Sequence, residues 1–445
     1  MKKADLPEAF VNRVSTDSFL GTALLDALNE DQPIAVRINS LKGASVFNEL
    51  ERIPWSKNGF YLKERPVFTL DPHFHGGRYY PQEAGSQFID SILHQLQLPE
   101  DPIILDLCAA PGGKSTLIAD FLAGKGLLLA NEVIQSRSRI LKENLTKWGA
   151  KNTLVSNNDP ADFEALSNTF DCILIDAPCS GEGMFRKDPD ARNEWSEESV
   201  NLCAARQKRI IMDIWNSLKL NGYLIYSTCT FNEQENEANV RWVLDQTDSE
   251  LVSTEIPQAK AGRNGIGHYA LPSELKTEGF YVAVIRKREE ERVQKNKPKK
   301  KISLTRIKPE NWLEKWAHTD QSEFLQWNTF LFAIPAGKPD LVENLHLQLR
   351  IIKLGTELGE ISRKGLIPNE ALALGNELLS DQIPDIPLSR KEALHYLKGE
   401  TFNLPGKQGF HTVSFEGTKL GWIKHLGNRF NNLYPKEWRI RMRID

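Results

Sequence analysis

Short apolar runs alternate with amphipathic stretches between residues 101 and 287, and this pattern constrains the fold more than any other feature. The runs are four to six residues long, which suits buried strands, and most of the stretches between them are long enough for crossover helices. Such an alternation is typical of a mostly parallel sheet covered by helices on both faces. We therefore predict a doubly wound α/β core over residues 101–288. The predicted strands are Ile103–Leu107, Leu127–Ala130, Asn152–Val155, Cys172–Ile175, Tyr223–Tyr226 and Phe280–Ile285, and the clearest helices are Arg137–Trp148 and Glu197–Leu218.

The chain has 445 residues, too many for one hydrophobic core, so we expect further parts on both sides of the sheet. Residues 1–100 are predicted to form an α/β N-terminal subdomain that binds RNA, with a helix that opens at Leu6–Phe10 and a strand at Pro33–Ile38. Residues 289–301 are basic and nearly free of apolar side chains, which indicates a solvated linker whose cations could also touch phosphates.

Two more parts are expected after this linker. Residues 302–383 are predicted to form an intermediate α/β domain, in which the glycine-containing segment Leu354–Glu360 should form turns. Residues 384–445 alternate short β-like runs, such as Gly409–Phe415 and Leu420–Lys424, with glycines. That spacing predicts a small C-terminal β-barrel.

The composition is that of an ordinary folded protein, with 40% hydrophobic and 26% charged residues. No apolar signal segment and no membrane-spanning run is found, so we expect a cytoplasmic protein. The five cysteines are odd in number and irregularly spaced, which predicts neither a disulfide framework nor a metal site. A net charge of −3 means that any affinity for nucleic acid must come from local basic patches.

A glycine-rich turn follows the first predicted strand of the core. The strand runs directly into Cys108, Ala109, Ala110, Pro111, Gly112, Gly113 and Lys114. A strand that enters such a turn before a helix brings backbone N–H groups close to a ligand. The Gly-Lys-Ser ending resembles a P-loop, but a P-loop would need glycine at position 108, where this chain has cysteine.

Acidic residues follow the next two strands. Glu132 comes directly after Leu127–Ala130 and Asn131, where a carboxylate can accept hydrogen bonds from a ribose diol. Asp159 follows the third strand and could reach an adenine, although either acid alone is more often a helix cap or turn residue. Together with the glycine-rich turn, the two acids predict a site for an adenosyl cofactor.

Two cysteines also lie just beyond predicted strands. Asp176-Ala-Pro-Cys179 follows Cys172–Ile175, and Thr228-Cys229 follows Tyr223–Tyr226. Open α/β sheets bind ligands at these carboxyl ends, so Cys179 and Cys229 are candidates for chemistry. Cys172 and Cys203 are assigned to packing instead.

These motifs carry a family resemblance. The strings CAAPGGK (Cys108–Lys114), DAPCSGEGMFRKDP (Asp176–Pro189) and YSTCTF (Tyr226–Phe231) resemble the NOP/Sun family of RNA cytosine-C5 methyltransferases. The similarity is greatest to the bacterial RsmF-like branch, which modifies small-subunit (16S) ribosomal RNA. It extends to the segment His73–Glu83 and to the C-terminal residues, which resemble the PUA-like RNA-binding domain of that branch.

The resemblance implies a Rossmann-like methyltransferase core that binds S-adenosyl-L-methionine through residues 108–114, Glu132, Asp159 and Asp176. It assigns to Cys229 the attack on carbon 6 of the cytosine, which turns the ring into an enamine that can take a methyl group at carbon 5. Cys179 is associated with release of the product. Asp176 would bind the N3/N4 edge of the base, which favours cytosine over uracil because the cytosine amino group is a donor.

One stretch departs from the RsmF-like pattern. Those proteins often carry a Pro-His pair and a Gly-Glu-Gly run before the last strand, where this chain has His268–Ser273 and Thr277–Phe280. The departure leaves the catalytic motifs intact. It limits how far contacts to the target base, and so the target nucleotide, can be transferred.

The C-terminal residues suit contact with RNA, because cations are interleaved with aromatic side chains. The cations are Lys419, Lys424, Lys436, Arg429, Arg439, Arg441 and Arg443, and the aromatic residues are Trp422, Phe430, Tyr434 and Trp438. The alternative is a barrel whose aromatic residues form its core, and periodicity favours that alternative for Trp422. We expect the segment as a whole to bind small-subunit ribosomal RNA or the small ribosomal subunit. We also expect the enzyme to be a monomer that binds no metal and no membrane.

Two other functions compete with RNA methylation. A DNA cytosine methyltransferase would use the Pro-Cys cysteine as the nucleophile. A ribosome-assembly factor that binds RNA without catalysis would be expected to have lost the cofactor turn or Cys229, and this chain retains both.

Overall fold

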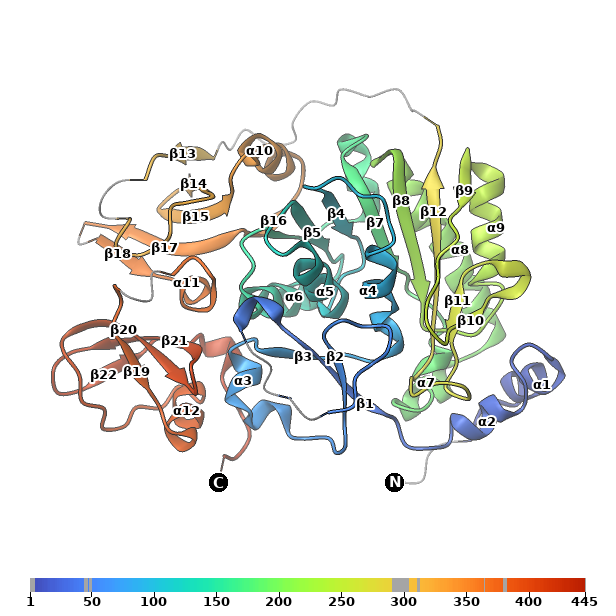
Figure 1. The fold of residues 1–445 in the computed structure, drawn as a ribbon, viewed down its shortest axis with the longest axis horizontal. Helices are drawn as coiled ribbons and strands as arrows, with labels where there is room; N and C mark the ends of the chain where they lie inside the picture. Colours follow the sequence, from blue (N-terminus) through green and yellow to red (C-terminus); the bar gives the residue numbers. More distant parts are fainter. Residues whose placement is uncertain are drawn as a thin grey trace.

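A computed structural model of the protein describes residues 5–43, 47, 50–289, 304–309, 313–363, 365–378 and 382–444. The described chain contains a ten-stranded sheet and three smaller sheets of three, five and four strands (Figure 1). The strand order along the large sheet is β10-β11-β12-β8-β7-β4-β5-β6-β16, with β9 paired to β12. Of the predicted linker 289–301, only residue 289 belongs to the described residues.

The centre of the large sheet is parallel, which confirms the predicted doubly wound core. β4, β5, β6, β7 and β8 pair in parallel in the order β6-β5-β4-β7-β8, and β12 joins β8 in antiparallel orientation. The strands are β4 (Ile103–Asp106), β5 (Leu127–Asn131), β6 (Thr153–Ser156), β7 (Phe170–Asp176), β8 (Leu218–Thr228), β9 (Ser249–Leu251), β10 (Lys260–Ala261), β11 (His268–Ala270) and β12 (Phe280–Lys287). The helices of this region are α4 (Phe88–Leu93), α5 (Gly113–Leu122), α6 (Gln135–Trp148), α7 (Pro189–Glu194), α8 (Glu197–Trp215) and α9 (Glu237–Gln246).

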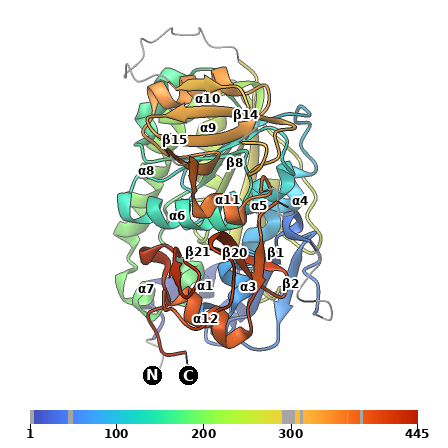
Figure 2. The same ribbon diagram turned by 90° about the vertical axis from the view of Figure 1, so that its left-hand side faces the viewer.

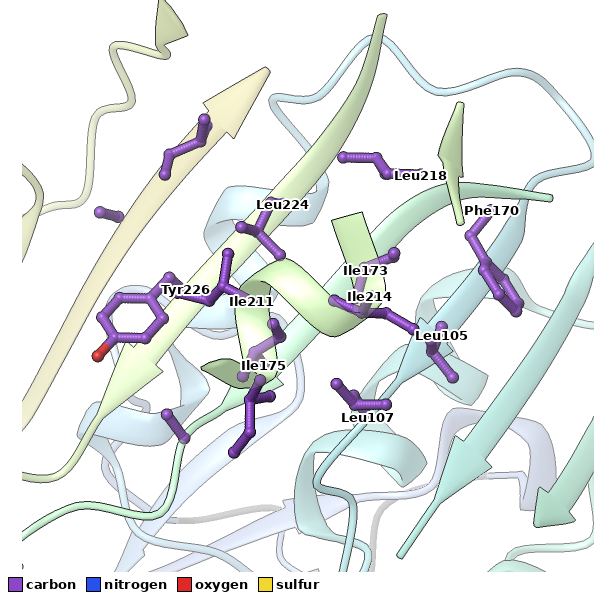
Figure 3. Close-up of a cluster of buried hydrophobic side chains, with 14 of the residues drawn as sticks. Leu105, Leu107, Phe170, Ile173, Ile175, Ile211, Ile214, Leu218, Leu224 and Tyr226 are labelled. Carbon is purple, nitrogen blue, oxygen red and sulfur yellow. The ribbon is translucent and has the colours of Figure 1, made fainter. Parts of the chain in front are cut away.

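Alternate residues of the central strands enter two separate hydrophobic clusters, one on each face of the sheet. On β7, Ile173 and Ile175 pack beneath α8, where Ile211 and Ile214 cover them (Figure 3). Cys172, on the other face, packs with residues of α4 and α5. Cys172 is therefore a core residue, as its sequence position indicated. The fully apolar strands follow from this burial on both faces.

The N-terminal residues wrap around the core. Strands β1 (Ile34–Ile38), β2 (Gly59–Leu62) and β3 (Tyr79–Pro81) form an antiparallel sheet in the order β2-β1-β3. Helix α1 (Glu8–Thr16) and helix α2 (Ala23–Ala27) lie apart from that sheet (Figure 1), and Phe10 packs edge-on against Phe185 and Trp195 of the core. Helix α1 thus covers the segment that follows Cys179.

The intermediate residues form a five-stranded sheet and also extend the large sheet. The elements are β13 (Thr305–Ile307), β14 (Ser322–Trp327), β15 (Phe330–Pro335), α10 (Pro339–Gln348), β16 (Ile351–Leu354), β17 (Thr356–Ser362), β18 (Gly365–Pro368) and α11 (Glu370–Leu374). β16 pairs with β6 in antiparallel orientation. The expectation that Leu354–Glu360 forms turns is wrong, because this segment is mostly strand. Gly355, at φ 53°, makes the single turn between β16 and β17.

The C-terminal residues form the four-stranded sheet β19-β20-β21-β22 with helix α12 (Arg390–Leu397) (Figure 2). The strands are β19 (Asp385–Pro387), β20 (Gly409–Phe415), β21 (Thr418–His425) and β22 (Phe430–Asn432). This unit docks on helix α3 (Pro72–His75): His73 Nδ1 lies 2.8 Å from Thr418 Oγ1, and His75 Nδ1 lies 3.2 Å from Tyr434 Oη. The histidines of the His73–Glu83 segment therefore join the N-terminal and C-terminal parts.

The division into residues 1–100, 101–288, 289–301, 302–383 and 384–445 stays a prediction. None of the helices in the described residues is long and apolar enough to span a membrane.

Candidate active site

The two candidate cysteines meet at the carboxyl edge of the sheet. Cys179 follows β7 and Cys229 follows β8, and these neighbouring parallel strands pair up to Asp176 opposite Ser227. The two Sγ atoms are 3.2 Å apart, and both side chains are half-buried. The hydrogen bond with Cys229 and burial both raise the pKa of the Cys179 thiol well above its ordinary value. Cys179 is therefore protonated at neutral pH.

Close backbone packing holds the two cysteine loops together. The N–H of Gly183 donates to the carbonyl oxygen of Cys229 at 2.8 Å. A Cβ at Gly183 would lie 2.7 Å from that oxygen and 3.0 Å from the carbonyl oxygen of Gly279. Only glycine fits where these three segments converge, which explains one glycine of the Gly-Glu-Gly-Met-Phe string after Cys179.

Asp176 is anchored between two partners. Lys114 Nζ forms an ion pair with Asp176 Oδ2 at 2.8 Å, and the hydroxyl of Ser227 donates to Oδ1 at 2.9 Å. Burial lowers the pKa of Lys114, but the Asp176 carboxylate beside it reverses the effect, so the net pKa lies above its ordinary value. Lys114 is therefore a cation that joins the cofactor turn to the strand end that carries Asp176.

The turn Cys108–Lys114 leads into α5 and is held from outside. Arg137 of α6 donates to the carbonyl oxygen of Ala110 at 2.9 Å, and Asn144 donates to that of Pro111 at 2.8 Å. Gly112 has φ 117°, a left-handed conformation that favours glycine, at the start of α5. Cys108 lies half-buried at the start of the turn, and burial raises the pKa of its thiol.

A buried aspartate lies beneath the cofactor turn. Asp106, at the end of β4, is fully buried and accepts a hydrogen bond from the Ser115 hydroxyl at 2.6 Å. Its second oxygen, Oδ1, is buried and has no hydrogen-bond partner in the structure. Burial raises the pKa of Asp106 to about 7, although Ser115 and Lys114 oppose the change. Sequence analysis placed Asp106 in the strand without assigning it a role.

The two acids predicted to contact the cofactor have different surroundings. Glu132 is 3% exposed; its Oε1 accepts the N–H of Ile134 at 2.9 Å, and its Oε2 lies 3.5 Å from Arg137 Nη1. Next to it, the apolar side chains of Val133 and Ile134 are 54% and 48% exposed. Asp159 is exposed, and its Oδ1 caps the 3-10 turn Pro160–Leu166 by accepting the N–H of Ala161 at 3.1 Å.

A buried polar layer behind the cysteines was not recognised from the sequence. Glu235 and Asn236 are both fully buried, and each bonds to a different cysteine loop. The signal was present in the acidic and amide residues Asn232–Glu237, which come directly after the Cys229 motif. No role was assigned to that run from the sequence.

The structure corrects the expected aromatic surface of the C-terminal segment at Phe430 and Tyr434, and at Trp422 it confirms the core position that periodicity favoured. Trp422, Phe430 and Tyr434 are at most 2% exposed and belong to hydrophobic clusters, so they cannot stack on RNA bases. Their alternation on short strands is the pattern of a small core. Trp438 is half-buried. The exposed cations of the segment are Lys424, Arg429, Lys436, Arg441 and Arg443.

The parallel sheet, the turn before α5 and the acid after β5 define a Rossmann-like methyltransferase, with two thiols and a carboxylate at the adjacent strand ends. Comparison with known families identifies its kind. Residues 93–286 match the family described as 16S rRNA methyltransferase RsmB/F. Residues 6–84 match the N-terminal domain of 16S rRNA methyltransferase RsmF, and residues 383–440 match the methyltransferase RsmF PUA domain. The chain belongs to the RsmB/F methyltransferase family.

Curated relatives match over nearly the whole chain. Ribosomal RNA small subunit methyltransferase F of Shewanella loihica is 31% identical, over 97% of this chain and 95% of the relative. The protein of the same name from Vibrio cholerae is also 31% identical, over 97% of each chain. These matches confirm the family resemblance found in the sequence motifs.

Solved structures resemble part of the chain. A methyltransferase homologue from Pyrococcus horikoshii is 29% identical with a TM-score of 0.54, over 63% of this chain and 95% of its own. NSun6 from the same organism, solved with SFG, has a TM-score of 0.56 over 64% of this chain and 99% of its own. At 22% identity, the second structure supports the fold alone.

Proposed function

We propose that the protein transfers a methyl group from S-adenosyl-L-methionine to carbon 5 of a cytosine in 16S ribosomal RNA, through a covalent bond between Cys229 and carbon 6. The observation that carries the proposal is the 3.2 Å separation of the Cys179 and Cys229 sulfur atoms at the cofactor edge of the sheet. The names of the relatives, which are small-subunit ribosomal RNA methyltransferases, support the RNA substrate. We also propose that the enzyme acts as a cytoplasmic monomer.

The residues at the strand ends fit an adenosyl cofactor. S-adenosyl-L-methionine would supply the electrophilic methyl group. The buried carboxylate of Glu132 suits the ribose diol, and the exposed apolar surface of Val133 and Ile134 beside it suits an adenine ring. The unpartnered Oδ1 of Asp106 is a second polar atom that a bound cofactor could satisfy. Asp159 would contact the adenine through the carboxylate oxygen that does not cap the 3-10 turn.

The proposed chemistry uses three side chains of this chain. Cys229 adds as a thiolate to carbon 6, forming a carbon–sulfur bond and placing electron density on carbon 5. Asp176, held by Lys114 and Ser227, accepts a hydrogen bond from the cytosine amino group and stabilises the adduct. After methylation, the carbon 5 proton passes to solvent, its electron pair re-forms the double bond between carbons 5 and 6, and the carbon–sulfur bond breaks with its pair on sulfur, which restores the Cys229 thiolate. We assign Cys179 to this release.

The target cytosine must leave its stack before Cys229 can reach carbon 6. The exposed cations of the C-terminal segment, Lys424, Arg429, Lys436, Arg441 and Arg443, are our candidates for phosphate contacts. Because most aromatic side chains of that segment are buried, we propose that its cations bind the phosphates of the RNA backbone and that its aromatic residues do not stack on bases.

Three experiments test the proposal. Bisulfite sequencing of small-subunit RNA from cells with and without the gene should show one or more 5-methylcytosines that depend on the protein. With purified protein and RNA, Cys179→Ala should accumulate a covalent RNA adduct and Cys229→Ala should form none. The reverse result would exchange the roles of the cysteines. Trapping on DNA but not on RNA containing 5-azacytosine would instead indicate a DNA methyltransferase.

A further inference from the structure

Two consecutive buried residues behind the site each hold a different cysteine loop. Glu235 and Asn236 lie between the Cys229 motif and α9, and both are fully buried. Neither can reach an RNA base, so any effect on the reaction must pass through the residues they bind.

Glu235 bonds to Ser180, which follows Cys179, and through Gln207 it is connected to Pro178, which precedes Cys179. Its Oε2 accepts the backbone N–H of Ser180 at 3.0 Å, and its Oε1 accepts the Ser180 hydroxyl. The side-chain amide of Gln207 donates to Glu235 Oε2 at 2.9 Å and to the carbonyl oxygen of Pro178 at 3.0 Å. The peptide groups before and after Cys179 are therefore fixed by one carboxylate and one amide. Burial raises the pKa of Glu235 to about 7, although the hydrogen bonds from Ser180 and Gln207 oppose the change.

Asn236 bonds to both neighbours of Cys229. Its Oδ1 accepts the hydroxyl of Thr228 at 2.6 Å, and its Nδ2 donates to the carbonyl oxygen of Thr230 at 2.9 Å. Nδ2 also lies 3.1 Å from the hydroxyl of Tyr269, which fixes the orientation of the amide. Asn236 therefore sets the direction of the loop that carries the Cys229 thiol.

We propose that Glu235 and Asn236 are positioning residues for separate steps of the reaction: Glu235 aligns Cys179 for release of the product, and Asn236 aligns Cys229 for attack on carbon 6. The inference rests on the proposed function, because it assigns a step to each cysteine. It adds that a substitution at either of these two buried residues can slow one step of the reaction without slowing the other. The two loops also touch each other, through Ser180 Oγ and Thr230 Oγ1 at 3.1 Å, through the two cysteine sulfur atoms at 3.2 Å and through the Gly183 N–H and the Cys229 carbonyl oxygen at 2.8 Å.

Isosteric substitutions separate the two roles. Glu235→Gln replaces one acceptor oxygen by an amide that faces the donors of Ser180 and Gln207. Asn236→Asp replaces the donor to the Thr230 carbonyl oxygen by an acceptor. Opposed polar groups of this kind leave buried atoms unsatisfied. Glu233→Gln is the matched control, since Glu233 lies two residues before Glu235 but is exposed and pairs with Arg241 at 2.6 Å.

The test measures formation and decay of the covalent protein–RNA adduct in single turnover with full-length protein, transcribed small-subunit RNA and S-adenosyl-L-methionine. Glu235→Gln should form the adduct within twofold of the wild-type rate and release it at least tenfold more slowly. Asn236→Asp should form the adduct at least tenfold more slowly and accumulate none. Glu233→Gln should match the wild type in both steps.

A merely structural role would slow both steps together in each variant, and that result would overturn the inference. Wild-type kinetics in Glu235→Gln and Asn236→Asp would do the same. If Glu235→Gln fails to fold, Ser180→Ala removes the hydroxyl that contacts Glu235 and Thr230 but keeps the backbone N–H that donates to Glu235, and it should slow release alone, to a smaller extent. Should the wild-type protein itself form no adduct, the proposed function fails, which is a different outcome from a failure of the inference.

Discussion

The buried carboxyl of Asp106 makes a prediction about stability and pH. Burial raises its pKa from 3.8 to about 7, although Ser115 donates a hydrogen bond to it. Above pH 7 the folded chain carries a buried carboxylate that the unfolded chain would hydrate freely. Between pH 7 and pH 4 the folded chain takes up a proton that the unfolded chain does not, so this contribution to stability becomes more favourable as the pH falls.

The magnitude follows from the two pKa values. A rise from 3.8 to about 7 for this fully buried group corresponds to a cost of about 4 kcal/mol at pH 8.5. The cost falls to about 2 kcal/mol at pH 5.5, where the folded carboxyl is mostly protonated. Asp106→Asn keeps the shape and an acceptor for Ser115 but removes the charge. It should therefore stabilise the protein by about those amounts, less roughly 1 kcal/mol for an amide that lacks a partner.

The assay is thermal unfolding of the cofactor-free protein at pH 5.5 and pH 8.5. For 445 residues that unfold together, the unfolding entropy is about 0.9 kcal/mol/K, so Tm should rise by about 3 to 5 °C at pH 8.5. The rise should be about 2 °C smaller at pH 5.5. Asp26→Asn, at an exposed aspartate of α2, serves as the control and should show no such difference. Equal shifts at both pH values, or a lower Tm at pH 8.5, would refute the reasoning.

Three further predictions concern the frame around the site. Gly77→Ala should destabilise the fold by about 3 kcal/mol or more, because Gly77 has φ 69° and a Cβ would lie 1.9 Å from a carbonyl oxygen of α6. Thermal unfolding should show this as a lower Tm. Arg37→Met should lower the free energy of unfolding by about 3 kcal/mol, and calorimetry should show weaker cofactor binding. The reason is that Arg37, which is 1% exposed, donates to a carbonyl oxygen of the turn Cys108–Lys114 at 3.2 Å. Lys114→Met should lower single-turnover methyl transfer at least tenfold with little change in Tm, because Asp176 loses its 2.8 Å partner; unchanged transfer would remove Lys114 from the site.

The central sheet could be predicted because its strands are buried on both faces. Each predicted strand of the core lies on a strand of the structure, closely for Ile103–Leu107 and β4 (Ile103–Asp106), whereas β8 (Leu218–Thr228) begins well before the predicted Tyr223–Tyr226. A run of consecutive apolar residues indicates that both faces of a strand are buried. It could not show that β16 extends the sheet, because an edge strand from a distant segment has no local signature. The turns expected at Leu354–Glu360 were also wrong. A glycine shows only that the backbone can adopt unusual conformations, and tertiary packing determines whether it lies in a turn or in a strand.

The candidate site was predicted in its members but not in its contacts. Strand ends indicated that Cys179 and Cys229 would be neighbours, yet the 3.2 Å separation of their sulfur atoms depends on loop packing around Gly183. The alternative role of Asp159, that of a cap or turn residue, is confirmed for one of its oxygens, and the sequence could not show that the second oxygen stays outside that turn. Glu235 was missed because a glutamate in a polar run reads as exposed, and only the fold shows that it is buried.

The His73–Glu83 segment shows why the N-terminal part is not a detachable RNA-binding unit. At one end, His73 and His75 contact Thr418 and Tyr434 of the C-terminal part. At the other end, Glu83 Oε1 accepts the backbone N–H of Glu278 at 2.9 Å, next to Gly279, which packs on Gly183 in the cysteine loops. One short segment thus contacts both the C-terminal part and the loop beside the proposed site. Because each of these contacts is made by a buried or half-buried side chain, removing the N-terminal residues would leave polar groups unsatisfied at both ends. The N-terminal residues therefore belong to the framework that holds the site, whatever RNA contacts they also make.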